Sequence, residues 1–331
     1  MPTTFRWCRL GLALAAVAAA AAWADDGAWW RFDRLVGAYD VDTPDQAKVF
    51  AQAGFTLTLL GRVPPGSALD TALADNHIVY IDQYPQYELY RVCLDQYHTA
   101  HRCNPKDEAA VLKAIRLHLV ETAQDPKVLG YWILDDYPYA DIKPMLRAIK
   151  ALIGEANRTA IFPRPAICSF GGDLAFKYTT PEPEFRVDNS YFDLAVSQFD
   201  AKACDMVALD PYGSSTSRDH RVIDWTMKDV LPHMMAALRA RGWDQRRAPL
   251  IGVPQTHASR DWSTKLRYTV EPTSEDLVTQ IEAYCRAGAV ALLAYSWNDI
   301  TPPPKEELFN TPAMVRGLQQ GAELCRQRYW R

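Results

Sequence analysis

The feature that most constrains the fold is a regular alternation of short apolar runs with helical patterns along the chain. The runs have no polar face, as strands of a parallel sheet require when both faces are buried. Helix starts such as Thr43-Pro44 and glycine stops such as Gly54 and Gly288 separate them. The expected strands lie at residues 35–39, 55–60, 77–81, 128–134, within 159–169, and at 205–209, 249–253 and 289–295. About eight such units predict an α/β fold, a (β/α)8 TIM barrel, rather than a doubly wound open sheet.

Residues 1–24 have the pattern of a secretory signal peptide. Arg6 and Arg9 precede an Ala-rich apolar run, and small residues flank Trp23 at the expected cleavage site. The run is too short for a comfortable membrane span, so we expect no stable membrane insertion after cleavage. The pattern predicts a periplasmic or secreted protein in which residues 25–331 form one barrel domain.

The charge balance bears on the class of partner. The formal net charge is −4, and no block rich in Lys or Arg stands out. Nucleic acid is therefore not expected as a partner, because its binding sites are built on clustered positive charge. We also expect neither a cofactor nor a resident metal ion.

An even number of cysteines remains when Cys8 is set aside with the signal peptide, which favours disulfides in an exported protein. Cys93 and Cys103 flank a loop rich in Tyr and His and are the best pair. Cys285 with Cys325 would join two late helices, and Cys168 with Cys204 is the residual pairing. Zinc bound by Cys93, His98, His101 and Cys103 is the alternative, but the spacing matches no common zinc motif.

Asp135 and Asp136 directly follow the apolar run 128–134, and Tyr137 comes next. Two neighbouring carboxylates repel each other, which tends to raise the pKa of one and leave that of the other low. General acid–base chemistry needs such a protonated acid beside an anion. The alternative is structural: one Asp caps the next helix while the other pairs with an Arg.

Polar and aromatic residues follow the expected strands, at the end of a TIM barrel where active sites lie. Acids and amides with aromatic walls suit a sugar, because its hydroxyls need hydrogen bonds and its C–H faces stack on rings. Taken singly, strand-end Asp and Asn residues can be ordinary helix caps. The residues expected to bind substrate are Asp40, Asp82, Tyr84, Tyr137, Tyr212, Gln255, His257, Trp297, Asn298 and Asp299, and Asp42, Arg62 and Ser169 follow the same strands.

Three stretches, residues 128–138, 206–212 and 295–299, resemble secreted TIM-barrel glycoside hydrolases, and the likeness extends over nearly the whole mature chain. In that superfamily the general acid is the second residue of a pair at the end of the fourth strand, which implies Asp136 as acid and Asp135 as its partner. The resemblance also implies that Trp297 forms the floor of a sugar site. The implied substrate is an oligosaccharide or polysaccharide.

The seventh strand departs from the pattern. Where retaining members with two Glu residues have their nucleophile, this chain has Gln255. The Asp-Asp pair is instead similar to hexosaminidases of the O-GlcNAcase type, in which the acetamido group of the substrate attacks. Inversion is the other option, with Asp136 as acid and Asp210, Asp40 or Asp299 activating water across about 6.5–9.5 Å.

Two other classes of function fit the sequence. A barrel that binds glycans without turnover would explain Gln255. A metal-assisted hydrolase could use the clustered Asp residues with His257, although no HExxH motif supports it.

Overall fold

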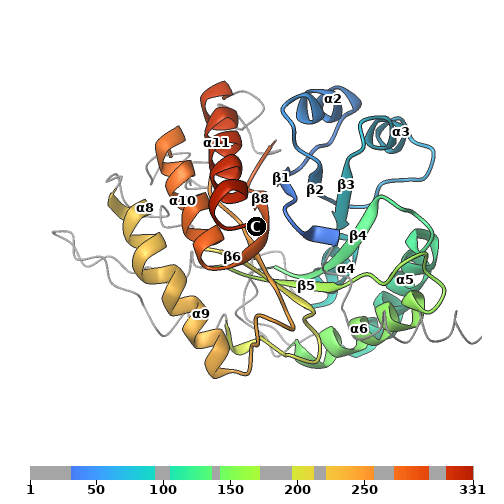
Figure 1. The fold of residues 1–331 in the computed structure, drawn as a ribbon. Coiled ribbons are helices and arrows are strands. Elements are labelled where there is room, and N and C mark those ends of the chain that lie inside the picture. Colours follow the sequence, from blue (N-terminus) through green and yellow to red (C-terminus); the bar gives the residue numbers. More distant parts are fainter. Residues whose placement is uncertain are drawn as a thin grey trace, which may run out of the picture.

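The computed structural model describes residues 31–93, 105–135, 142–171, 196–211, 221–256, 272–297 and 311–330. Within them, eight parallel strands close into a barrel in chain order, so that the last strand pairs with the first. The helices surround this barrel (Figure 1). The predicted (β/α)8 TIM barrel is therefore confirmed.

The strands of the barrel are short, as is usual for this architecture. They are β1 (Val36–Tyr39), β2 (Leu57–Leu60), β3 (Val79–Asp82), β4 (Val128–Leu134), β5 (Ala166–Gly171), β6 (Met206–Asp210), β7 (Leu250–Gly252) and β8 (Ala289–Ala294).

Alternation along the strands produces two separate cores. One set of side chains fills the barrel, for example Leu59, Trp132 and Ile251. The other set, for example Leu60 and Cys168, packs against the helices. Because side chains alternate between the two faces of a strand, membership of these cores tells which strand positions face the interior.

The helices begin and end where capping residues allow. They are α2 (Pro44–Gln52), α3 (Ala68–Asp75), α4 (Tyr84–Cys93), α5 (Pro105–Thr122), α6 (Lys143–Asn157), α8 (Arg221–Trp225), α9 (Leu231–Ala240), α10 (Ser274–Arg286) and α11 (Pro312–Arg328). Thr43 caps α2 through Gln46 N at 3.2 Å, and Thr273 forms a capping box with Asp276. None of the helices in the described ranges is long and apolar enough to cross a membrane.

Two helical regions differ from expectation. Residues 84–93 were expected to begin a loop, but they form α4, whose Leu89 is fully buried. The single helix expected at 224–241 is interrupted by a π-helical turn, η3 (Thr226–Val230), just before Pro232. A proline lacks the amide hydrogen of a regular helix, and the Leu231 amide bonds instead to Thr226 O, five residues back.

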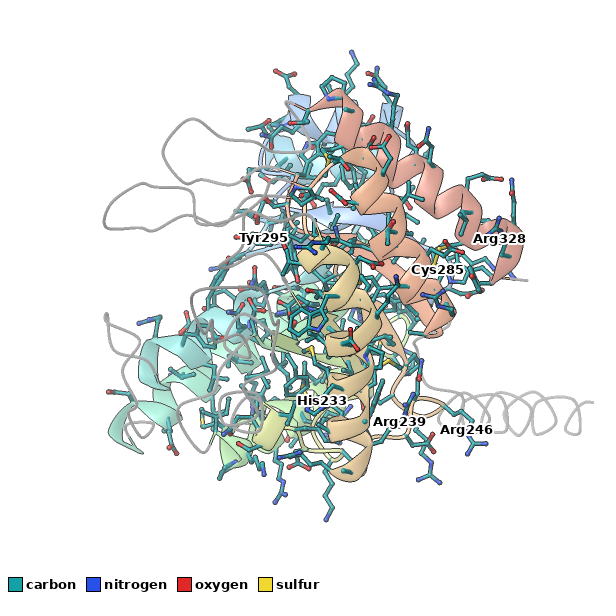
Figure 2. The ribbon with its side chains drawn as sticks, turned by 90° about the vertical axis from the view of Figure 1, so that its left-hand side faces the viewer. His233, Arg239, Arg246, Cys285, Tyr295 and Arg328 are labelled. Carbon is teal, nitrogen blue, oxygen red and sulfur yellow. A yellow bond between two sulfur atoms is a disulfide. The ribbon has the colours of Figure 1, made fainter. Side chains whose placement is uncertain are left out.

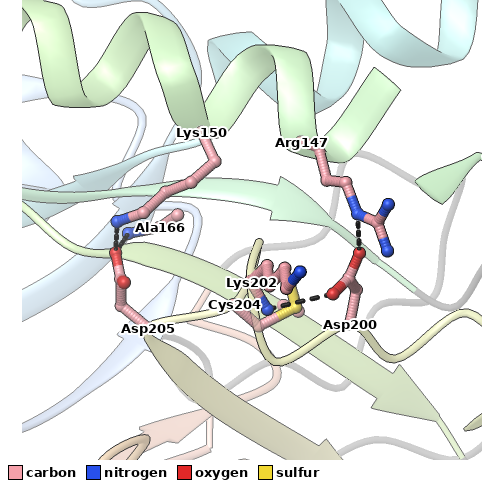
Figure 3. The surroundings of a disulfide bond; sticks show 8 residues. Arg147, Lys150, Ala166, Asp200, Lys202, Cys204 and Asp205 are labelled. Atoms are coloured by element: carbon pink, nitrogen blue, oxygen red, sulfur yellow. Dashed lines mark hydrogen bonds and ion pairs between the residues drawn. A yellow bond between two sulfur atoms is a disulfide. The ribbon is translucent and has the colours of Figure 1, made fainter. Parts of the chain in front are cut away.

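Two disulfides join neighbouring parts of the outer layer. Cys168–Cys204 links β5 to the segment before β6, and Cys285–Cys325 links α10 to α11, as the sequence suggested. Around the first, Arg147 pairs with Asp200 and Lys150 with Asp205, which fastens α6 to the same segment (Figure 3). The expected Cys93–Cys103 pair cannot be followed in the structure, because Cys103 lies outside the described residues.

Candidate functional site

The C-terminal ends of β6 and β7 direct two of the predicted site residues inward. Met206 and Ala208 fill the barrel, so Asp210, two residues further on, lies on the same inner face. It is almost fully buried. Ile251 and Val253 are likewise interior, and Gln255 continues their face at the end of β7.

Asp135 reaches the same end of the barrel because β4 contains an irregularity. Trp132 pairs with Ile167 but Leu134 pairs with Cys168, so one residue of β4 is extra. Leu134 therefore faces the helices with Cys168, and the alternation of side chains along a strand assigns the next residue, Asp135, to the inner side. The Asp135 amide donates to the Tyr90 hydroxyl of α4 at 3.1 Å, which fixes the backbone at the start of the acid pair.

Gln255 is held by a dedicated side chain. The side chain of Gln280 on α10 accepts from the backbone N–H of Gln255 at 2.8 Å and donates to the backbone carbonyl of Gln255 at 3.1 Å. Both glutamines are 2 % exposed. Gln255 also forms an isolated bridge with Tyr295, so the backbone of the seventh strand is fixed beyond its regular ladder.

An aromatic trio, Tyr39, Trp132 and Tyr295, lies at this end of the barrel. The Tyr39 ring is in T-shaped contact with both other rings. Its centroid lies 5.8 Å from that of Trp132 and 5.1 Å from that of Tyr295. Figure 2 shows Tyr295 on the left of the molecule, away from Arg246 and Arg328 on the right. Edge-to-face packing leaves these rings fixed beneath the strand ends.

The structure adds two residues that the sequence analysis missed, Gln83 directly before α4 and Tyr87 within it. The Tyr87 hydroxyl donates to Gln83 Oε1 at 3.0 Å. Burial, followed by the carboxylates of Asp40, Asp135 and Asp42, raises the pKa of Tyr87 to about 12. The phenol thus lies within electrostatic reach of predicted site residues from β1 and β4. Gln83, Tyr87 and Tyr90 are spaced four and three residues apart, which a helical reading of this stretch would have placed on one face.

Asp82 and Tyr84, two predicted site residues, lie away from the barrel interior. Tyr80 and Asp82 face the helices, and Asp82 is fully buried. Its Oδ2 is 2.5 Å from Nε2 of His118 on α5, and its Oδ1 accepts from the Tyr84 amide at 2.9 Å. The Tyr84 ring stacks on His118 with centroids 4.2 Å apart, so both residues anchor α4 rather than line the barrel.

Trp297 also differs from its expected place. Its ring is 1 % exposed and packs edge-on against Phe50 and Phe55, at centroid distances of 5.0 and 6.1 Å. These are residues of the core between barrel and helices. The aromatic trio occupies the position at the strand ends that had been expected for Trp297.

The remaining predicted site residues lie outside the described part of the chain. They are Asp136, Tyr137, Tyr212, His257, Asn298 and Asp299. Within the part that is described, no group of three or more His, Cys, Asp or Glu side chains is placed to hold a metal ion.

Comparison with known proteins gives a likeness of fold. No family model matches the chain, and no curated protein does. Among solved structures, a β-glucuronidase from Ruminococcus gnavus superposes with a TM-score of 0.54 at 12% identity over 88% of this chain and 50% of its own. A β-galactosidase from Marinomonas ef1 gives 0.50 at 8% identity, over 88% and 59%. A broad-specificity endoglucanase from Clostridum cellulovorans gives 0.50 at 12%, over 88% and 94%.

The neighbours are TIM-barrel glycoside hydrolases. The resemblance inferred from the sequence is thus confirmed at the level of the fold. The chain spans about half the length of the β-glucuronidase that it matches. At such low identity the likeness shows the barrel alone, and function has to be argued from the site.

Proposed function

We propose that the protein is an exported glycoside hydrolase, made with a signal peptide at residues 1–24 and acting in the periplasm or outside the cell. Asp136 is its general acid and Asp135 the partner carboxylate. The observation that carries the proposal is that Asp135, Asp210 and Gln255 stand at the C-terminal ends of β4, β6 and β7, at the end of the barrel where the aromatic trio lies. Carboxylates and an amide beside fixed rings match the polar and apolar sides of a sugar.

The proposed chemistry assigns separate tasks to the carboxylates. Asp136 donates its proton to the glycosidic oxygen as the bond to the anomeric carbon breaks. In the substrate-assisted form, the acetamido oxygen of the substrate attacks that carbon, and Asp135 orients the group. In the inverting form, Asp210 takes a proton from the water that attacks, with Asp40 and Asp299 as the other candidates for this base. The support for Asp210 is its inward position on β6.

Leaving-group dependence tests the role of the acid. Asp136→Asn keeps the size of the side chain but cannot deliver a proton, so turnover should fall by about 10²–10⁴. Nitrophenyl glycosides need little protonation and should be affected least. Asp135→Asn should slow activated and unactivated glycosides alike, since orientation or charge stabilisation is lost. If Asp136→Asn is equally slow on both kinds of substrate, Asp136 is not the acid.

A second function, glycan binding without turnover, is favoured by one observation. The position that holds a nucleophile in many barrels carries Gln255, whose backbone is hydrogen-bonded on both sides by the Gln280 side chain. Such a protein would bind oligosaccharides with the same residues. Wild-type protein that binds a glycan but releases no reducing sugar over prolonged incubation would establish this function in place of hydrolysis.

A further inference from the structure

Tyr87 stands out from the other tyrosines of α4 because its side chain remains accessible. It is 48% exposed, whereas Tyr84 is stacked on His118 and Tyr90 binds the Asp135 amide. Its ring lies against Gly61, just past the end of β2. A Cβ atom at Gly61 would be 3.1 Å from Cε2 of the ring, closer than side chains normally pack. The glycine therefore allows the ring to approach the strand end closely.

The hydroxyl of Tyr87 is oriented as firmly as its ring. It donates to Gln83 Oε1 at 3.0 Å, and the backbone N–H of Gln83 donates to Leu60 O at 2.7 Å. Both contacts tie the phenol to the end of β2. With its proton committed to Gln83, the phenol oxygen offers a lone pair to a hydrogen-bond donor.

The helix that carries Tyr87 is anchored at its start. Asp82 accepts from the Tyr84 amide and contacts His118, while the Tyr84 ring packs on that imidazole. These contacts are buried, so they hold the first turn of α4 against β3 and α5. A rigid support of this kind lowers the entropy lost when a side chain binds a ligand.

We propose that Tyr87 is a sugar-binding residue of the site, an inference that rests on the proposed glycan function. Its exposed ring stacks on the C–H face of a pyranose, and its phenol oxygen accepts a hydroxyl hydrogen from the same sugar. Tyr90, three residues further along the same helix, accepts from the Asp135 backbone amide at 3.1 Å, and the carboxylates of Asp40 and Asp135 act electrostatically on the Tyr87 phenol, so the bound sugar lies near Asp135. Tyr87 thereby contributes to the choice of substrate without taking part in bond cleavage.

Three variants test the residue. Tyr87→Ala removes the ring, Tyr87→Phe removes only the hydroxyl, and Gly61→Ala displaces the ring without changing its chemistry. Leu117→Ala is the control, because Leu117 is an exposed apolar residue of α5 with 58% exposure. The probes are nitrophenyl monosaccharide glycosides together with cello- and chito-oligosaccharides. Dissociation constants are measured by calorimetry and KM and kcat by product release, after the melting temperature has shown each variant to be folded.

Tyr87→Ala is expected to raise KM and the dissociation constant by at least about tenfold, with kcat little changed. Tyr87→Phe should raise them by about threefold to tenfold, the value of one hydrogen bond. Gly61→Ala should fall between the two, and Leu117→Ala should match wild type.

The outcomes separate this inference from the proposed function. If wild type hydrolyses a glycan and folded Tyr87→Ala keeps both constants, Tyr87 is not a sugar-binding residue and hydrolysis stands. If wild type binds without turnover and Tyr87→Ala loses binding, Tyr87 is supported and hydrolysis fails. If wild type neither binds nor cleaves any probe, both proposals are wrong.

Discussion

At the N-terminal end of the barrel, Arg164 is almost fully buried, and every nitrogen of its guanidinium group donates to a backbone carbonyl. The acceptors belong to Val128, Ala123, Asp125 and Phe162, and the group also lies over the Phe162 ring. At the C-terminal end, by contrast, Ser169 Oγ and Trp132 Nε1 are buried with no hydrogen-bond partner among the described residues.

The difference between the two ends is whether a buried polar group finds its hydrogen-bond partners within the fold. A buried polar atom usually has a partner, so an unpaired one calls for an explanation. At the N-terminal end all donors of Arg164 serve the fold, and burial lowers its pKa. Toward the C-terminal end, the Ser169 hydroxyl and the Trp132 indole nitrogen are buried on β5 and β4 without such a partner among the described residues.

The largest expected effect on stability belongs to Arg164. Arg164→Met keeps much of the length of the side chain but removes its hydrogen bonds to four backbone carbonyls. We expect the free energy of unfolding to fall by about 3 kcal/mol or more, while turnover per folded molecule stays at the wild-type level. Unfolding in guanidinium chloride measures the change, and Arg158→Met, at an exposed position, is the control. A loss below about 1 kcal/mol would mean that this end of the barrel does not depend on the cation.

Substitution of two glutamines at opposite ends of the barrel tests whether the two ends differ in their effect on activity. Gln280→Ala removes both bonds to the Gln255 backbone, and should cost about 1–2 kcal/mol and lower glycan turnover or affinity as well. Gln245 donates to the carbonyls of Ala287 and Gly288 just before β8, at the N-terminal end. Gln245→Ala should lower stability without touching activity. Equal effects of the two variants on activity would abolish the functional distinction between the ends.

The smallest expected effect is that of Ser169→Ala. Because the hydroxyl is buried without a described partner, its removal should leave the free energy of unfolding unchanged or raise it by up to about 1 kcal/mol. Thermal unfolding at several scan rates measures this. A marked loss of stability would show that the hydroxyl serves the fold, as the donors of Arg164 do.

The fold could be predicted from the sequence because its signals are local. Apolar runs and capping residues such as Thr43 and Thr273 are visible along the chain, and parallel strands buried on both faces leave few alternatives. The helix at residues 84–93 was not predicted, because Tyr84-Pro85 suggests a turn after the strand. What makes it helical is tertiary: Asp82 caps its first turn and Leu89 is buried.

The site was less predictable, because the direction of a strand-end side chain depends on register. Asp82 and Asp210 both close a short apolar strand, yet Asp82 faces the helices and Asp210 faces the interior. Asp135 faces inward only because β4 contains an extra residue. The residue types alone do not tell which face of a strand its last residue occupies, and they do not reveal an extra residue within the strand.

The disulfides have a further consequence for the response of the chain to proteolysis. Cys168–Cys204 closes a covalent ring between positions separated by 36 residues, and Cys285–Cys325 closes another between positions separated by 40. A single backbone cut inside either ring opens a loop but releases no fragment. Strands β5 and β6, and likewise α10 and α11, would remain parts of one molecule after such a nick, so cleavage there would not by itself take the barrel apart.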